Sequence, residues 1–320
     1  MLTNENVFRD IARLIVWYPV RWMISFLPVR YAFPIFRLFG NIHYWVSPGK
    51  RKTVMNNLTI LSKNNGGPDR LKKWTYEYLQ THYINQLIIF LFPRLNQKNI
   101  HHIHSFSGLN WLGTELSAGN PVILLHAHFG PVHLPLFHLG AIGYRIKQIG
   151  YLRKPKEITL IGDKVSFRLR ERYERMIPAE IIQANRFLGE AFRHLRSGGI
   201  LMMTGDGTGG SEFIGDFKQV PFLGCTKLFP AGPVKLARKT GATILPMFTI
   251  RESRVNRYLT IIEPPVFRGS TEVLSSEAPV ITHFAKIFES YIHRQPYHWH
   301  FWDEFSTGTH SECRLAVTDI

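Results

Sequence analysis

The stretch PVILLHAHFGPVHLPLFHLGAIG, residues 121–143, has a pattern that indicates the fold class. It begins with a short apolar run of the kind that buried strands show. The segment that follows predicts a helix starting near Pro131, since proline is tolerated in a first turn. A strand followed directly by a helix is the unit from which α/β domains are built. Between the two, HAHFGPVH places His126, His128 and His133 within eight positions.

The same alternation of strands and helices continues downstream. Apolar runs predict strands at 145–153, 200–206, 243–252 and 257–267. Amphipathic patterns predict helices at 186–199, 229–241 and 278–294. We therefore predict an α/β fold over residues 111–305, a mixed sheet flanked by helices. We expect interfacial helices at 1–40, a helical region at 41–110 and a tail at 306–320.

The composition narrows the class of partner. The 320 residues are 45% hydrophobic, which is ample for a packed core, and carry a net charge of +16. Such a charge indicates an anionic partner: nucleic acid, an anionic lipid surface or an acidic protein. Nucleic acid is not expected, because the sequence has no zinc-finger spacing, aromatic RNA-binding signature or basic heptad region. The cysteines, Cys225 and Cys313, lack the CxxC spacing of a metal site.

The N-terminal segment 13–40, RLIVWYPVRWMISFLPVRYAFPIFRLFG, is aromatic and aliphatic but interrupted by Arg21, Arg30 and Arg37. No uninterrupted apolar run approaches the roughly 20 residues of a spanning helix. Short apolar segments alternating with arginines fit interfacial helices that lie on an anionic membrane leaflet. The alternative is a set of ordinary buried helices capped by arginine.

The three histidines allow three chemistries. Together they could hold a zinc ion in a metal-dependent hydrolase, although HAHFGPVH contains no carboxylate. General-base chemistry needs less: one imidazole at the carboxyl end of a strand, where ligands bind in open α/β sheets. We expect His128 to be that base and His133 to point back toward it. His126 is expected to face the other way as a core residue. Neither a metal nor a cofactor is predicted.

The order of segments resembles the late lipid A acyltransferases of the lauroyl/myristoyl type, within the glycerolipid acyltransferase superfamily. HFGPVHLPLFHLGAIGYRIKQIGYLRKP is similar to the catalytic block of that family, with His128, Gly130, Arg153 and Pro155 at matching positions. LRSGGILMMTGDGTGG is similar to the family's strand that ends in an aspartate, here Asp206. The likeness runs over roughly residues 20–305.

One departure from the family pattern concerns the chemistry. His133 stands where the family has an acid five residues after the catalytic histidine. In the family that acid orients the histidine and stabilises its protonated form. A neutral His133 supplies no negative charge, and a protonated one would lower the basicity of His128. Asp206 is expected to be either a substitute orienting acid or a structural turn residue.

The resemblance implies a membrane-associated acyltransferase. It would move a fatty acyl group from a thioester, on acyl carrier protein or coenzyme A, to a hydroxyl or amine of a lipid acceptor. An acidic carrier protein suits the positive net charge. The resemblance also implies a peripheral or monotopic protein at the cytoplasmic face of a bacterial inner membrane.

Two groups of residues are expected to bind substrate. Gly130 and Arg153 belong to the catalytic block, with Arg153 and helix-start N–H groups near the oxyanion or the donor's phosphate. Arg168, Arg170 and Arg172 form a dense basic run, which either holds a phosphorylated head group or is a solvated helix face. The alternatives to an acyltransferase are the metal-dependent hydrolase and a non-catalytic lipid-binding relative.

Overall fold

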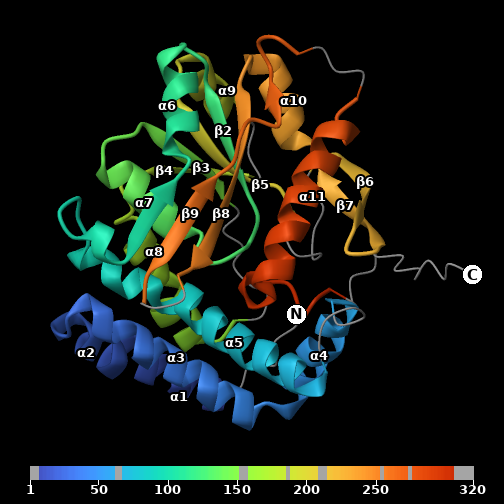
Figure 1. The fold of residues 1–320 in the computed structure, drawn as a ribbon. Coiled ribbons are helices and arrows are strands. Elements are labelled where there is room, and N and C mark those ends of the chain that lie inside the picture. The colour runs from blue at the N-terminus through green and yellow to red at the C-terminus, as the bar shows by residue number, and fades with distance from the viewer. Residues whose placement is uncertain are drawn as a thin grey trace, which may run out of the picture.

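The fold was determined as a computed structural model, which describes residues 7–61, 67–150, 158–184, 188–207, 215–252, 256–272 and 276–305. The N-terminal third is helical and forms a layer beneath the sheet (Figure 1). Its helices are α1 (Val7–Ile15), α2 (Arg21–Phe26), α3 (Val29–Val46), α4 (Pro48–Leu58) and α5 (Pro68–Leu87). Shorter turns are η1 (Val16–Val20), η2 (Thr59–Leu61), η3 (Ile88–Arg94) and η4 (Ile100–His102). Pro28 separates α2 from α3, since the residue before a proline is driven to extended backbone and Leu27 has ψ 144°.

The central sheet has the strand order β1-β9-β8-β2-β5-β3-β4, with β10 paired to β8. These strands are β1 (His104–Ser107), β2 (Val122–His126), β3 (Ile146–Gly150), β4 (Glu180–Gln183), β5 (Ile200–Thr204), β8 (Thr243–Arg251), β9 (Tyr258–Ile262) and β10 (Phe267–Arg268). From β8 to β4 all neighbours are parallel, whereas β9 and β10 run antiparallel to β8. The predicted α/β fold with a mixed sheet is therefore confirmed.

Helices cover both faces of the sheet, and the central strand β2 is buried on both sides. Ile123 and Leu125 face a core completed by α9 (Gly189–Arg196), α10 (Gly232–Thr240) and α11 (Ala278–Arg294). Val122 and Leu124 face a second core with α6 (Leu109–Ser117), α7 (His133–Ala141) and the N-terminal helices. A strand that is buried on both faces has apolar residues at consecutive positions, which explains why the sequence PVILL shows no alternation of apolar and polar residues.

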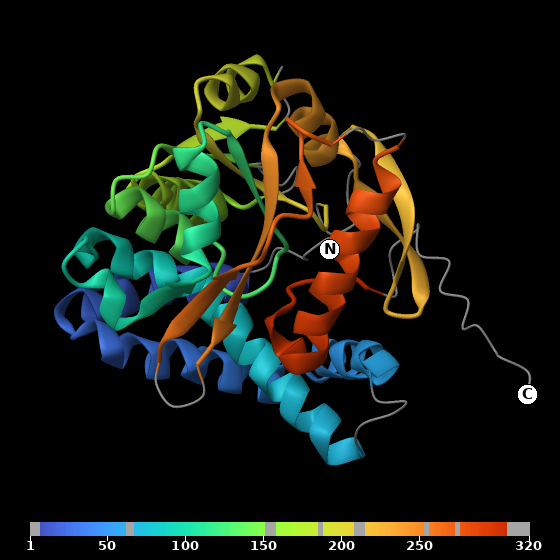
Figure 2. The same ribbon diagram turned by 45° about the horizontal axis from the view of Figure 1, so that its top comes forward.

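A hairpin that the sequence did not predict packs beside α11 (Figures 1 and 2). Its strands are β6 (Phe217–Phe222) and β7 (Cys225–Pro230). The predicted helix at 229–241 was therefore wrong at its start, because β7 runs to Pro230 and α10 begins at Gly232. The turn is the pair Leu223 and Gly224, both with positive φ, which is the backbone of a two-residue hairpin turn. A hairpin turn of this type usually reads Asn-Gly, because leucine rarely adopts a positive φ. The Leu-Gly pair therefore did not indicate a hairpin in the sequence.

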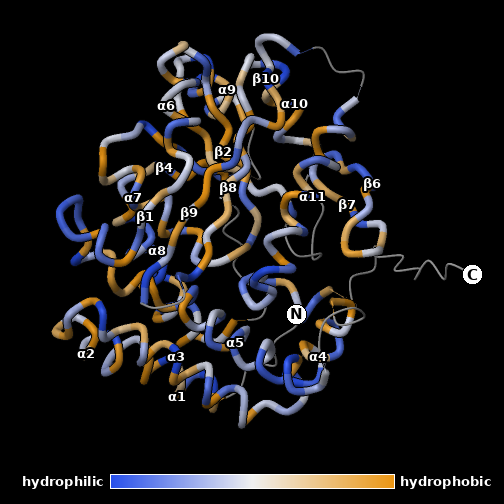
Figure 3. The backbone as a smooth tube through the Cα atoms, viewed as in Figure 1, coloured by the Kyte–Doolittle hydropathy of each residue, from blue (hydrophilic) through white to orange (hydrophobic). Residues whose placement is uncertain are grey.

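Exposed apolar side chains concentrate in the N-terminal layer, whose helices contain many hydrophobic positions (orange in Figure 3). Thirteen of the sixteen exposed large apolar side chains in the described residues lie between positions 7 and 46. They are Val7, Phe8, Ile11, Ile15, Tyr18, Trp22, Met23, Phe26, Tyr31, Leu38, Ile42, Trp45 and Val46. Other residues of the same helices, such as Trp17, Phe33 and Phe36, are buried in the core. Within the described ranges, no helix has the length and apolar character needed to cross a membrane.

Three short elements complete the fold near the site. η5 (Gly162–Phe167) and α8 (Arg168–Glu174) follow β3, and η6 (Pro296–His298) follows α11. Thr159, just before η5, bonds Asp10 of α1, while Tyr173 of α8 bonds Arg21 of α2. These contacts attach the segment after β3 to the N-terminal layer.

Candidate active site

Two parallel neighbouring strands bring His128 and Asp206 together. The register between β2 and β5 pairs His126 with Thr204. Two residues after the end of β2 lies His128, and two residues after the end of β5 lies Asp206. Because both strands end at the carboxyl edge of the sheet, the two side chains meet there.

Asp206 is the hydrogen-bond partner of His128. Nδ1 of His128 lies 2.9 Å from Oδ1 of Asp206, and the His128 backbone N–H donates to Oδ2 at 3.0 Å. Trp299 Nε1 donates to the same Oδ2 at 3.2 Å. Asp206 is only 3% exposed, and this burial would raise its pKa. The nearby imidazole and the two hydrogen bonds from His128 outweigh burial and hold the pKa of Asp206 below its ordinary value.

This contact fixes the chemistry of the imidazole. A carboxylate only accepts hydrogen bonds, so Nδ1 of His128 carries a proton and donates it to Asp206. In the neutral ring the lone pair is then on Nε2, and no described residue bonds to that atom. The His128 side chain is 28% exposed and lines a pocket of about 460 Å³. His128 therefore presents a basic nitrogen to the pocket.

The loop that carries His128 is held by the C-terminal segment after α11. The His298 carbonyl accepts the Gly130 N–H at 2.9 Å, and the His128 carbonyl accepts the His300 N–H at 2.9 Å. Gly130 has φ +68°, and a Cβ atom there would lie 2.3 Å from the Thr249 carbonyl oxygen. Only glycine fits this position without strain. Since its N–H is already bonded, Gly130 shapes the loop and has no free donor for a substrate.

The other histidines of the site lack an acid partner. Burial lowers the pKa of His126 to about 4 and the pKa values of His133 and His300 to about 3. All three line the same pocket as His128, and the His126 and His128 rings lie 6.3 Å apart. The expectation that His126 faces away from His128 was therefore wrong, because residues two apart along an extended chain point to the same side.

The family model described as bacterial lipid A biosynthesis acyltransferase matches residues 7–304. The chain belongs to this family. The match spans the N-terminal helices, the sheet and the C-terminal segment that holds the His128 loop. The protein is therefore an acyltransferase that transfers an acyl group to a lipid A precursor. No curated protein matches the chain.

The arginines expected to bind substrate in this acyltransferase have separate places. Arg170 lines the pocket and is held by Glu174, at 2.7 Å, and by Gln86, also at 2.7 Å. Arg168 and Arg172 are exposed on the other side of α8 and do not line the pocket. The run RLRER is thus split by helical periodicity into one pocket residue and two surface residues. Arg153 lies outside the described residues.

A metal site finds no support in the geometry of the acyltransferase. In the described part of the chain, no three His, Cys, Asp or Glu side chains gather in an arrangement that could hold a metal ion. His126 donates from Nδ1 to its neighbour's carbonyl, and His128 donates to Asp206. The alternative of a metal-dependent hydrolase therefore has no ligand set there.

Sequence reasoning missed three residues that surround the pair. Trp299 and His300 come from the C-terminal segment, far from His128 in the sequence. Nζ of Lys227, on β7, lies 4.5 Å from the centroid of the Trp299 ring. Burial lowers the pKa of this lysine to about 8, although the negative charge of Asp206 acts to raise it. The signal that could have found Trp299 and His300 is the aromatic and histidine-rich segment QPYHWHFWDEF, residues 295–305.

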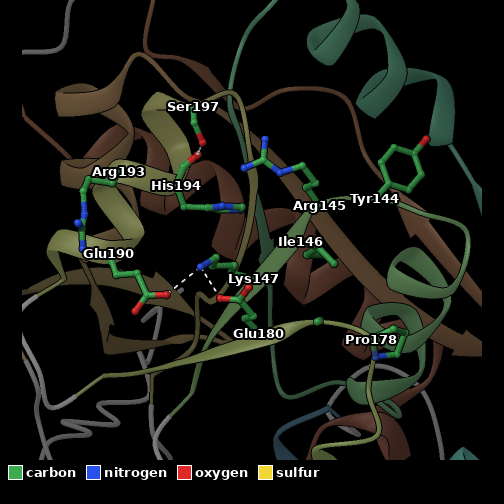
Figure 4. A pocket seen from close by; sticks show the side chains of 11 residues that line it. Tyr144, Arg145, Ile146, Lys147, Pro178, Glu180, Glu190, Arg193, His194 and Ser197 are labelled. Atoms are coloured by element: carbon green, nitrogen blue, oxygen red, sulfur yellow. Dashed lines mark hydrogen bonds and ion pairs between the residues drawn. The ribbon is translucent and has the colours of Figure 1, made fainter.

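A larger cavity, of about 760 Å³, lies at the opposite end of the strands (Figure 4). It is lined by residues at the amino ends of β3 and β4 and along α9. Lys147 projects into it and is paired with Glu180 and with Glu190, the latter at 2.8 Å (Figure 4). Lys147 is thus neutralised by these two carboxylates, and the cavity lies away from the carboxyl edge where His128 and Asp206 meet.

Proposed function

We propose that His128 is the general base of acyl transfer and that Asp206 positions it. Nε2 of His128 takes the proton of an acceptor hydroxyl or amine while that oxygen or nitrogen attacks the thioester carbonyl. Collapse of the tetrahedral intermediate breaks the carbon–sulfur bond, and the thiolate leaves with the proton returned by His128. The observation that carries this proposal is the 2.9 Å contact between Nδ1 and the buried carboxylate, which leaves Nε2 open to the pocket.

Asp206 replaces the acid that is missing five residues after His128. His133 stands at that position, and its low pKa makes it a neutral ring that cannot stabilise an imidazolium by charge. The carboxylate of Asp206 reaches His128 from the neighbouring strand instead. On this view His133 shapes the pocket wall beside Arg170.

Two unpartnered acceptors in the pocket suit a hydroxyl-bearing acceptor. Nε2 of His126 and Oε1 of Gln148 are buried and have no hydrogen-bond partner in the described structure. Since Nδ1 of His126 already donates to a carbonyl, its Nε2 can only accept. Buried polar atoms normally find partners. Hydroxyl or amide N–H groups of the acceptor would supply the missing donors.

The donor and the location follow from charge and from the apolar surface. A net charge of +16 favours an acidic acyl carrier protein as the source of the thioester, with coenzyme A as the other anionic possibility. The apolar outer face of α1, η1, α2 and α3 favours an interfacial position on the anionic inner leaflet of a bacterial inner membrane. The acceptor would then reach the pocket from the membrane surface.

Lipid mass spectrometry of a producing cell tests the proposal. Cells with the wild-type protein should contain an acylated lipid that is missing in cells with His128→Ala at equal protein level. His283→Ala is the matched control, because it removes an exposed imidazole on α11 that does not line the pocket, and it should retain product. An unchanged lipid profile in His128→Ala cells would instead favour another base, and loss of product in both variants would deny His128 a specific role.

A further inference from the structure

A third cavity lies where the N-terminal layer meets the carboxyl end of β8 and the segment before β9. It has a volume of about 1330 Å³ and is bounded by α3, α5, the adjoining ends of β8 and β9, and the segment after α11. Figures 1 and 2 both place those strand ends against α3 and α5. Asn256, before β9, donates from Nδ2 to the Arg30 carbonyl at 3.3 Å, which links the two sides. This cavity shares no lining residue with the catalytic pocket.

The charges around this third cavity favour an anion. Four cations line it, Arg30, Arg37, Lys73 and Arg251, against two carboxylates. Both carboxylates already face arginines. Glu77 lies 3.4 Å from Arg251, and Glu252 lies 3.3 Å from Arg257, which is outside the lining. The remaining positive charge is therefore not balanced from within the wall.

Arg37 is the least compensated of these cations. Its side chain is half-buried and makes no hydrogen bond or ion pair with another described residue. Burial lowers the pKa of this arginine, and repulsion by Arg251 lowers it further. An enclosed guanidinium normally has a partner, because removing a charge from water is costly. A guanidinium offers two parallel N–H donors, which match the bidentate geometry of a phosphate.

The neighbouring surface of α3 indicates which kind of molecule would bring a phosphate to this cavity. Arg30, Pro34 and Arg37 follow helical spacing toward the cavity. The adjacent stripe of the same helix exposes apolar side chains: Tyr31 at 48%, Leu38 at 53%, Ile42 at 49% and Trp45 at 72%. A free phosphate or a nucleotide would gain nothing from that stripe. An acyl chain lying along it would place a phosphate at the mouth of the cavity.

We propose that this cavity binds the phosphate group of a membrane lipid, held by Arg37 and Arg251 with Arg30 and Lys73 at the rim. The lipid is either a phospholipid of the bilayer or the phosphorylated acceptor itself. A narrow gap lined by Tyr297, Asn85 and His300 lies along α5 between this cavity and the catalytic pocket. A lipid held here would thus fix the height of the catalytic pocket above the membrane.

Binding can be measured without any acyl transfer, so its failure is separate from failure of the proposed function. The protein in dodecyl maltoside is titrated with dioctanoyl phosphatidic acid and with dioctanoylglycerol, which differ only in the phosphate. Wild type should bind the phosphate lipid and show a higher thermal midpoint with it. Arg37→Gln should weaken that binding about tenfold or more, as loss of a charged hydrogen-bond pair does. Arg37→Lys, which keeps the charge but loses the fork, should fall between.

Lys52→Gln is the matched control, because it removes one charge from an exposed position on α4 away from the cavity. Two further measurements on Arg37→Gln distinguish a bilayer phospholipid from the phosphorylated acceptor as the source of the phosphate. Loss of phosphatidic acid binding with an unchanged acceptor KM in Arg37→Gln assigns the site to the bilayer. A raised KM for the phosphorylated acceptor, but not for its dephosphorylated form, assigns it to the acceptor.

Three results would overturn the proposal. One is equal binding of the lipids with and without phosphate. Another is equal loss of binding in Lys52→Gln and Arg37→Gln, which would mean that only net charge matters. The third is a raised KM for acyl carrier protein alone in Arg37→Gln, which would assign the arginines to an acidic protein.

Discussion

Replacing Asp206 by asparagine isolates the charge of the His128–Asp206 pair, because the two side chains have the same shape. Oδ2 of Asp206 accepts two donors, the His128 backbone N–H at 3.0 Å and Trp299 Nε1 at 3.2 Å. Only a carbonyl oxygen satisfies both, so the amide NH₂ must face Nδ1 of His128. Nδ1 then becomes an acceptor and the ring proton moves to Nε2, where the base needs its lone pair.

The expected loss is large for catalysis and small for folding. We expect kcat to fall about 100- to 10,000-fold, the range that a positioned general base contributes. The free energy of unfolding should fall by about 1–3 kcal/mol, because the charge-assisted hydrogen bond to Nδ1 becomes a neutral one while the two bonds to the remaining oxygen persist. Asp206→Ala should destabilise the protein more, since it leaves the buried Trp299 donor and the His128 N–H unpaired.

The stability difference should also depend on pH with a definite sign. The pKa of Asp206 lies below its ordinary value in the folded protein, so its stabilising effect is complete above the unfolded value, roughly pH 4. That effect is lost as the pH falls through the lowered folded value. The gap in thermal midpoint between wild type and Asp206→Asn should therefore be full at pH 7 and shrink in acid.

Initial rates of thiol release, at saturating thioester and lipid acceptor in detergent, measure the catalytic effect, with circular dichroism as a check on folding. Asp216→Asn is the matched control, because Asp216 is an exposed carboxylate paired with lysines near the start of β6. It should keep the wild-type rate. A folded Asp206→Asn protein with the wild-type rate would contradict the claim that Asp206 positions His128 and would leave Asp206 as a structural turn residue.

Four further outcomes are expected. Gly130→Ala should lower the free energy of unfolding by more than about 2 kcal/mol in denaturant titration, since a Cβ at φ +68° would lie 2.3 Å from a carbonyl oxygen; unchanged stability would mean that the loop can move. Gln148→Leu should raise the acceptor KM but not lower the thermal midpoint, because its Oε1 is buried without a partner; a lower midpoint with an unchanged KM would make the side chain structural. Trp22→Glu with Phe26→Glu should shift the protein from the membrane pellet to the supernatant without loss of thermal stability, as both side chains are exposed, whereas retention in the pellet would deny that this face meets the membrane. His133→Ala should reduce the rate less than His128→Ala and leave the pH–rate profile unchanged between pH 5 and 8, because the pKa of His133 is about 3; equal loss would give His133 a chemical role.

Elements with a strong local pattern could be predicted from the sequence. The helix predicted at 278–294 is α11, and the strand predicted at 121–126 is β2 to within one residue. The short edge strands β1 and β4 were missed, since each has only four residues and no clear alternation. The predicted strand at 145–153 is β3 as far as Gly150, and its last residues lie outside the described part.

The proposed active site could be predicted only in part, because much of it depends on contacts between distant segments. A histidine and an aspartate that each follow an apolar strand were visible, but their pairing depends on the β2–β5 register. The sequence could not show that Trp299 completes the carboxylate's hydrogen bonds or that His298 occupies the Gly130 N–H. These contacts are set by α11, which returns the chain to the carboxyl edge of the sheet.

The hydrogen bonds from residues 298–300 to the His128 loop can form only late in synthesis, after the rest of the fold has been translated. The apolar N-terminal helices leave the ribosome before the segment that ties down Gly130 and His128. If the N-terminal helices bind a lipid surface as proposed, the nascent chain reaches that surface while the proposed base is still unsupported. On that proposal, a chain truncated ahead of Pro296 should bind the membrane without transferring an acyl group and should compete there with the finished protein.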